Sequence, residues 1–119
     1  MILKKFETTA AITKFSEMIF EDAELAAVLE KVWDILYTLF NTVNISHGSI
    51  NAENMLCRDG QLSLINFDTA VPSEGQFGKV FLKRDCKNVA KMITRLGLKI
   101  DDKKLIESIL SCRKDLKWY

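Results

Sequence analysis

The sequence predicts a mainly α-helical domain with one small β-hairpin, an α+β fold. Apolar residues recur at three- and four-residue intervals from Leu25 to Val43, and two short apolar runs flank Asp59-Gly60. Two further amphipathic stretches follow Asp85 and Asp101. A helical period sustained over several turns indicates a helix with one buried face, and an Asp-Gly pair between apolar runs is typical of a tight hairpin.

Two helices are expected in the first part of the chain. A short helix begins at Thr8 or Thr9, whose hydroxyl can cap it, and ends near Phe20. Asp22 restarts the pattern, and the long helix that follows is the predicted centre of the core. The apolar residues of this helix are Leu25, Val28, Leu29, Val32, Trp33, Leu36, Tyr37, Leu39, Phe40 and Val43.

A polar, irregular segment from Asn44 to Asn54 separates the long helix from the hairpin. The two expected strands are Met55 to Cys57 and Leu62 to Phe67, joined at Asp59-Gly60. No later segment has a clear strand pattern.

Residues 71–84 contain a proline and two glycines and are expected to form a loop. Asp85 is expected to cap the next helix, which ends near Gly97, a residue suited to a left-handed turn. A last helix begins at Asp101 or Asp102. The inner faces of these two helices are expected to be Val89, Met92, Ile93 and Leu96, and then Leu105, Ile109 and Leu110.

Composition limits the class of protein. The 119 residues, 48% hydrophobic and 28% charged, fit one globular domain over residues 1–119. Net charge is +1, but residues 1–78 carry 5 basic and 11 acidic side chains, and residues 79–119 carry 12 and 5. In the fold these charges either compensate one another internally or form separate acidic and basic faces.

Targeting and redox features favour a cytoplasmic, intracellular protein. No long apolar segment predicts a membrane span or a secretion signal. Three cysteines, Cys57, Cys86 and Cys112, form no C-x-x-C pair and are accompanied by a single histidine. These numbers argue against a disulfide framework and against a metal site, so no metal ligand is assigned.

Two motifs stand at a defined separation in the middle of the chain. The first is His47-Gly48-Ser49-Ile50-Asn51-Ala52-Glu53-Asn54, and the second is Asn66-Phe67-Asp68. Together they resemble the catalytic centre of the protein kinase superfamily, with its H-x-D-x-x-x-x-N loop and its later D-F-G motif. The resemblance covers about residues 8–112 and concerns the C-terminal lobe only.

The departures from the kinase motifs affect the chemistry. Ser49 stands where the family has the aspartate that orients the substrate hydroxyl, and a neutral hydroxyl cannot serve as that base. Asn66 stands where the family has the metal-binding aspartate, and Asp68 is displaced by two positions from that place. Asn54 matches a metal ligand of the family, but it is one neutral amide.

The other matching residues have structural interpretations. The resemblance implies that His47 anchors the loop by hydrogen bonding and that Phe67 belongs to the core. Asp85 either caps its helix alone or also holds the backbone near His47. No Gly-rich loop or strand lysine precedes the long helix, so the N-terminal lobe is expected to be absent.

Two surface features are candidates for interaction. Four basic residues repeat at helical spacing and form either a solvated face or a docking surface for an acidic or phosphate-bearing partner. They are Arg84, Lys87, Lys91 and Arg95. The basic tail, residues 113–119, ends in Trp118-Tyr119, which either fold back on the core or serve in an interaction.

The favoured interpretation is a catalytically inactive, pseudokinase-like module that binds other proteins as an adaptor or scaffold. In this respect it resembles the kinase non-catalytic C-lobe domains. No enzyme activity, catalytic residue or cofactor is expected. Expected partners are a protein or peptide, or a second copy of the chain, and ATP and nucleic acid are not expected. The alternative is a nucleotide-binding or weak phosphotransferase subunit whose missing lobe is supplied by a partner chain.

Overall fold

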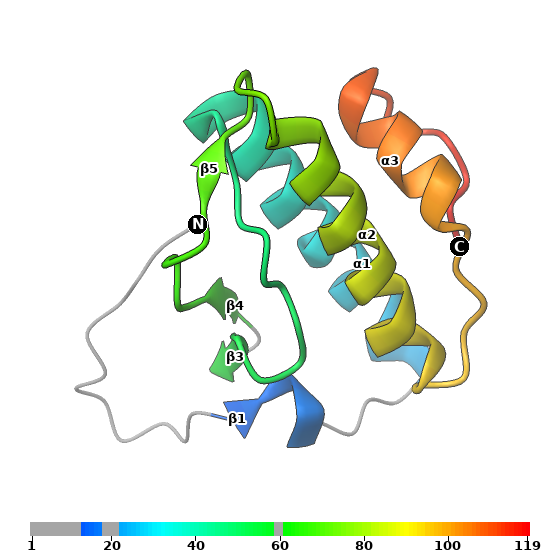
Figure 1. Ribbon diagram of the computed structural model, residues 1–119. Helices are drawn as coiled ribbons and strands as arrows, with labels where there is room; N and C mark the ends of the chain where they lie inside the picture. The colour runs from blue at the N-terminus through cyan, green and yellow to red at the C-terminus, as the bar shows by residue number, and fades with distance from the viewer. Residues whose placement is uncertain (1–12, 18–21, 59–60) are drawn as a thin grey trace.

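The computed structural model describes residues 13–17, 22–58 and 61–119. Three α-helices, α1 (Asp22–Tyr37), α2 (Gly78–Thr94) and α3 (Asp102–Leu110), lie beside two small antiparallel sheets (Figure 1). The strands gather on one side, α3 lies on the other, and α1 and α2 lie between them. The predicted α+β class is confirmed. Among the described residues, no helix is both long enough and apolar enough to cross a membrane.

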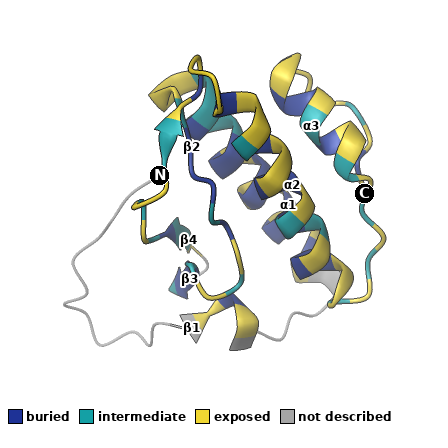
Figure 2. Cartoon of the chain, in the orientation of Figure 1, coloured by how far each residue is buried: buried dark blue, intermediate teal, exposed yellow. Residues whose placement is uncertain are grey.

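The long central helix was predicted from its apolar spacing and is present. α1 continues without a break into a π-helical stretch, η2 (Thr38–Val43). Asn44 ends it in the left-handed region at φ 65°, which asparagine tolerates better than most residues, and its amide donates to the Leu39 carbonyl. The inward side chains of α1 form much of the core, and Figure 2 shows that face as buried.

The predicted hairpin is also present. It consists of β3 (Met55–Arg58) and β4 (Gln61–Leu64), and Met55 is opposite Leu64 in the antiparallel register. The turn, residues 59–60, lies outside the described residues. The predicted second strand was too long, because β4 ends at Leu64 and residues 65–67 leave the sheet.

A third strand replaces part of the predicted first helix. Residues Thr13–Lys14 form β1, which pairs with Leu56 and Cys57 of β3, and Phe15–Glu17 form a short 3-10 helix, η1. The predicted helix from Thr8 or Thr9 to Phe20 is therefore wrong at residues 13–14 and is reduced to one 3-10 turn at residues 15–17, and its remainder lies outside the described residues. β1 forms because the edge of β3 offers backbone N–H and C=O groups for pairing. The local sequence pattern gives no sign of this pairing.

A second small sheet was not predicted. β2 (Ile45–Ser46) pairs with β5 (Val71–Pro72), so that Ser46 lies opposite Val71. The amide of Ser73 extends the pairing by donating to the Asn44 carbonyl at 2.9 Å. The pairing of β2 with β5 fixes both ends of residues 47–70, the segment that carries both sequence motifs.

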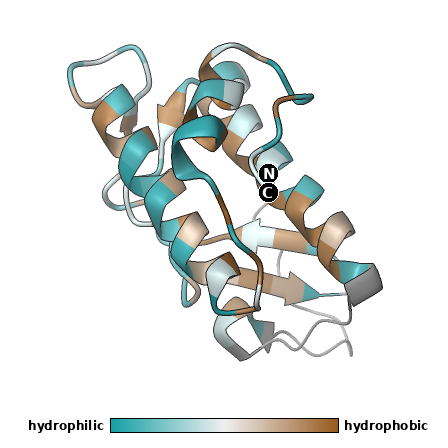
Figure 3. Cartoon of the chain, turned by 90° about the vertical axis from the view of Figure 1, so that its right-hand side faces the viewer, coloured by the Kyte–Doolittle hydropathy of each residue, from teal (hydrophilic) through white to brown (hydrophobic). Residues whose placement is uncertain are grey.

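Helix α2 begins earlier than expected. Residues 71–84 were predicted to be a loop, but α2 starts at Gly78, after Phe77, which makes no side-chain capping bond. The helix buries Leu82, Cys86, Val89, Met92 and Ile93, and Gly97 follows its end at φ 95°. Figure 3 shows the alternation of hydrophobic and hydrophilic positions around the helices.

Helix α3 closes the other side of the core. Asp101 caps it by accepting a hydrogen bond from the Lys104 amide, as expected, and Leu105 and Ile109 are buried. The predicted inward position of Leu110 is wrong, because its side chain is 39% exposed.

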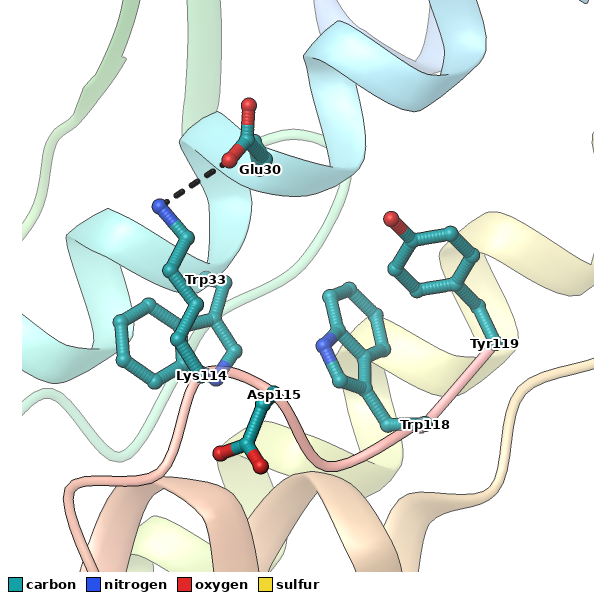
Figure 4. A pocket seen from close by; sticks show the side chains of 6 residues that line it. All are labelled: Glu30, Trp33, Lys114, Asp115, Trp118 and Tyr119. Carbon is teal, nitrogen blue, oxygen red and sulfur yellow. Dashed lines mark ion pairs between the residues drawn. The ribbon is translucent and has the colours of Figure 1, made fainter.

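The tail folds back across α1. Asp101 donates its amide to the Trp118 carbonyl at 2.8 Å, and the Trp118 side chain is only 2% exposed. Lys114 pairs with Glu30 of α1 at 3.2 Å, and together with the two terminal aromatic residues they line a pocket (Figure 4). Trp118 is therefore a core residue, which agrees with the expected alternative that the tail folds back on the core.

Candidate functional site

His47 fixes the start of the loop between β2 and β3. Its ring is fully buried, its Nε2 lies 3.0 Å from the Ile65 carbonyl oxygen, and its Nδ1 accepts a hydrogen bond of 3.0 Å from the Ser49 amide. Because Nδ1 accepts, the ring proton is on Nε2, which donates to Ile65. Phe67 covers the ring edge-on, with centroids 4.8 Å apart. Both ring nitrogens are thus used to hold two segments together.

Asp85 holds the same loop from the opposite side. Its carboxylate accepts hydrogen bonds from the amides of Gly48 at 3.0 Å and Ile50 at 3.3 Å. The side chain is 1% exposed, and this burial raises its pKa, although the two amides and Arg84 partly offset the effect. Asp85 lies well inside α2 and does not cap it, but the expected alternative that it holds the backbone near His47 agrees with these bonds. We call the hydrogen bonds of His47 and Asp85 the loop anchor.

Gly48 allows the loop to approach α2 closely. Its φ of 85° favours glycine, and a Cβ at this position would lie 2.6 Å from the ring of Phe81 and 3.3 Å from the Thr69 carbonyl oxygen. The first contact is shorter than any side chain tolerates without a shift. The backbone at residue 48 therefore lies directly against the first turns of α2.

Ser49 is linked to the second motif through Thr69. The two hydroxyl oxygens are 2.5 Å apart, and the Thr69 hydroxyl donates to the His47 carbonyl at 2.8 Å. Since Thr69 has one proton and uses it there, Ser49 is the donor of the shorter bond. A hydroxyl held in this way is neutral and cannot abstract a proton at neutral pH.

Asn54, the last residue of the first motif, connects it to the segment that carries the second. Its Nδ2 donates to the Ser49 carbonyl at 2.9 Å, so its Oδ1 is left as an acceptor. Its backbone carbonyl accepts the Ile65 amide at 3.0 Å, which brings the following residue, Asn66, next to it. Asn66 is exposed and adopts the left-handed region at φ 63°. The structure thus brings the residues of the two motifs into one site.

The donor set of this site does not fit the magnesium site that the kinase family implies. Asn54 and Asn66 offer neutral amide oxygens, whereas magnesium in phosphate sites is held through carboxylates. Asp85 is buried and occupied by the loop amides, Glu53 pairs with Lys14 at 3.0 Å, and Asp68 is exposed. Within the described ranges, no three His, Cys, Asp or Glu side chains are grouped as metal ligands.

Sequence reasoning missed two contributors to the site. Thr69 connects Ser49 to His47, and Phe81 forms the surface against which Gly48 packs. Thr69 follows the second motif directly, but no spacing rule assigns a hydroxyl there to the loop. Phe81 was hidden because residues 71–84 were predicted to be a loop.

The predicted basic stripe is exposed along α2 and its end. Arg84 reaches back to the site, where its guanidinium lies 4.5 Å from the centroid of the Phe81 ring and 3.4 Å from the Gly48 carbonyl oxygen. Lys87, Lys91 and Arg95 are exposed further along. Tyr119, the other predicted interaction residue, is 55% exposed beside the tail pocket (Figure 4).

Comparison with known protein families identifies one match over most of the chain. Residues 2–105 match the RIO domain family. The matched range includes both motifs, the hairpin, all of α2 and the first turn of α3.

Curated relatives carry related names. The chain is 35% identical over 63 residues to the RIO-type serine/threonine-protein kinase Rio1 of Haloferax volcanii, which is 53% of this chain and 22% of the relative. It is 26% identical over 85 residues to mouse serine/threonine-protein kinase RIO3, which is 71% of this chain and 16% of the relative. It is 31% identical over 62 residues to serine/threonine-protein kinase RIO1 of Caenorhabditis elegans, which is 52% of this chain and 12% of the relative. The chain thus spans less than a quarter of each relative.

These names correct one expectation and support another. The expectation that the chain is not an enzyme is wrong, because its relatives are named serine/threonine-protein kinases and indicate a kinase enzyme family. The resemblance to the protein kinase superfamily is confirmed. The chain belongs to the RIO domain family.

Proposed function

We propose that the chain supplies the catalytic-loop half of a phosphate-ligand site in a RIO-type, kinase-related protein, and that a second lobe completes this site. The observation that supports the proposal is the loop anchor. His47 and Asp85 hold residues 47–50 with four hydrogen bonds to backbone groups, and none of these bonds involves Ser49 or Asn66 side chains. A rigid loop of this kind is what positions a ligand.

In this proposal the fold corresponds to the C-terminal lobe of a kinase. The second lobe belongs to another part of a longer protein, to a different partner chain, or to a second copy of this chain. The short share of each relative that the chain spans is consistent with either arrangement. The three cysteines are free, which fits a reducing compartment inside the cell.

The residues of this chain define what the half-site can contact. Asn54 presents its Oδ1, Asn66 presents an exposed amide, and Ser49 holds its hydroxyl toward Thr69. Phosphate oxygens accept hydrogen bonds, so the donors available to them are the Asn66 amide and the second Nδ2 proton of Asn54, whereas Asn54 Oδ1 only accepts and the Ser49 proton is used by Thr69. All these groups are neutral and add no negative charge to repel a phosphate. His47 and Asp85 act as positioning residues.

Nuclear magnetic resonance of the ¹⁵N-labelled chain tests the proposal, because half of a site binds weakly. During titration with millimolar ATP, we expect saturable shifts of the amides of Ser49, Asn54, Asn66 and Thr69. We expect these shifts in EDTA as well as in magnesium, since the donor set does not fit the metal.

Two variants control the titration. Asn54→Ala removes the amide beside Ser49 and should weaken ATP binding about fivefold, as one lost hydrogen bond of about 1 kcal/mol does. Asn88→Ala changes the same residue type on α2, away from the site, and should have no effect. Shifts confined to α2, whose basic residues attract any polyphosphate, would contradict the proposal.

A further inference from the structure

One side of α2 carries a mostly exposed stripe. Apart from the adjacent Val80 and Phe81, its members recur at intervals of three or four residues, which places them on one helical face. We call this the α2 stripe, and it consists of Phe77, Val80, Phe81, Arg84, Lys87, Lys91 and Arg95. Phe77 and Val80 are 51% and 53% exposed, and the four basic residues are also exposed. The stripe has an apolar end and a basic end.

The basic end has no acidic partner among the described residues. The one acidic residue of α2 is Asp85, which is buried and bound to the loop amides. Two exposed cations of the tail, by contrast, have acidic partners, since Lys114 pairs with Glu30 and Arg113 pairs with Asp115. Like charges four residues apart destabilise a helix by about 0.2–0.5 kcal/mol per pair. The stripe therefore keeps an electrostatic cost that an acidic partner would remove.

The apolar end lies beside the loop of the candidate site. The rings of Phe77 and Phe81 are 6.1 Å apart, and Arg84 covers the face of Phe81 at 4.5 Å. Arg84 also lies within 3.4 Å of the Gly48 carbonyl oxygen. A partner bound along the stripe would thus have one end next to residues 48 and 69.

We propose that the α2 stripe docks an acidic peptide segment of another protein, with an apolar side chain of that segment seated on Phe77 and Val80. The acidic side chains face Lys87, Lys91 and Arg95, which supply the charge complementarity. From residue 77 to residue 95 the helix rises roughly 27 Å, a length that about eight extended residues span. This inference does not depend on the proposed phosphate-ligand site, which the α2 stripe adjoins at Phe81 and Arg84.

Nucleic acid fits the stripe less well than a peptide. Binding of single strands uses aromatic rings interleaved with basic residues, so that bases stack while phosphates are neutralised. No aromatic residue lies between Arg84 and Arg95, and the ring face of Phe81 is covered by Arg84.

The test is a fluorescence-anisotropy titration with a labelled peptide of about ten residues, rich in Asp and Glu, with one leucine near an end. We expect saturable binding, and Lys87→Glu with Lys91→Glu should weaken it at least tenfold. The matched control, Lys103→Glu with Lys104→Glu, changes the net charge equally on α3 and should weaken binding less than threefold. Equal losses in the two double variants would overturn the proposal.

The apolar contact has its own control. Phe77→Ser should weaken binding of the leucine peptide several-fold but not of the same peptide with serine in place of leucine. The proposal would be overturned if Phe77→Ser weakened binding of both peptides equally, or if neither peptide bound. Tighter binding of a single-stranded RNA of matched charge would also overturn it. All variants change exposed residues, so circular dichroism should confirm an unchanged fold.

Discussion

Replacing Asp85 with alanine is expected to lower the free energy of unfolding by about 3 kcal/mol, because it leaves two buried backbone donors without an acceptor. The Gly48 and Ile50 amides have their bonds at 3.0 and 3.3 Å to this carboxylate, and both residues are buried. Chemical denaturation monitored by circular dichroism measures the change. Asp115→Ala removes an exposed carboxylate and should leave the stability unchanged.

The pH dependence of the Asp85 contribution follows from its pKa. Burial raises the pKa of this carboxyl in the folded state above its ordinary value of 3.8. The stability that the group contributes is therefore fully present below the unfolded-state pKa and is lost as the pH rises through the folded-state pKa. The difference in stability between the parent chain and Asp85→Ala should accordingly be largest at pH values below 3.8 and should fall as the pH rises through the raised folded-state pKa. A difference that grows toward alkaline pH would contradict this assignment.

Replacing Gly78 with alanine is expected to destabilise the protein by about 3 kcal/mol, which corresponds to a fall in Tm of roughly 10 °C. A Cβ at this position would lie 2.0 Å from the carbonyl oxygen of Ser73, a backbone atom that cannot rotate away. In an unobstructed helix the same change would stabilise, because alanine has the higher helix propensity. The sign of the effect therefore tests the packing of β5 against the start of α2.

Gly75→Ala is the matched control for Gly78→Ala. A Cβ there would lie 3.3 Å from the Pro72 carbonyl oxygen, and residue 75 is exposed. Thermal unfolding should show a much smaller change for this variant. The Gly78 carbonyl also accepts the Ser46 hydroxyl at 2.7 Å, so a displaced helix would disturb the strand that leads into the loop anchor.

Local pattern was sufficient to predict α1 and the hairpin. The apolar period of α1 follows from helix geometry alone, and the strands beside Asp59-Gly60 are adjacent in sequence. β1 could not be predicted in this way, because Thr13 and Lys14 are strand residues only through pairing with Leu56 and Cys57. Pairing over such a distance leaves no period in the sequence.

The start of α2 shows how a polar residue can mislead. Asp85 precedes an apolar periodic run, as an N-cap does, and it was interpreted as one. Its actual partners, Gly48 and Ile50, are more than thirty residues away in the sequence. Gly78, where α2 begins, has no cap signal, since Phe77 makes no side-chain bond there.

The candidate site was predictable in its membership but not in its connections. The motif spacing identified His47, Ser49, Asn54 and Asn66, and the structure brings them together. The role of Thr69 depends on the path of residues 67–70, which folds back over His47. That path is tertiary structure, so no residue pattern revealed it.

The most direct test of the account is the metal response of Asn66→Asp. If Asn54 and Asn66 face one site of kinase type, a carboxylate at position 66 should restore cation binding, because it supplies the ligand that the site lacks. Paramagnetic Mn²⁺ should then broaden the amide resonances of residues 54 and 66–68 in Asn66→Asp. The parent chain and the control Gln76→Asp, which places a carboxylate in an exposed turn, should show no such broadening. Equal broadening in all three proteins, or none in Asn66→Asp, would contradict the assignment of these residues to one site.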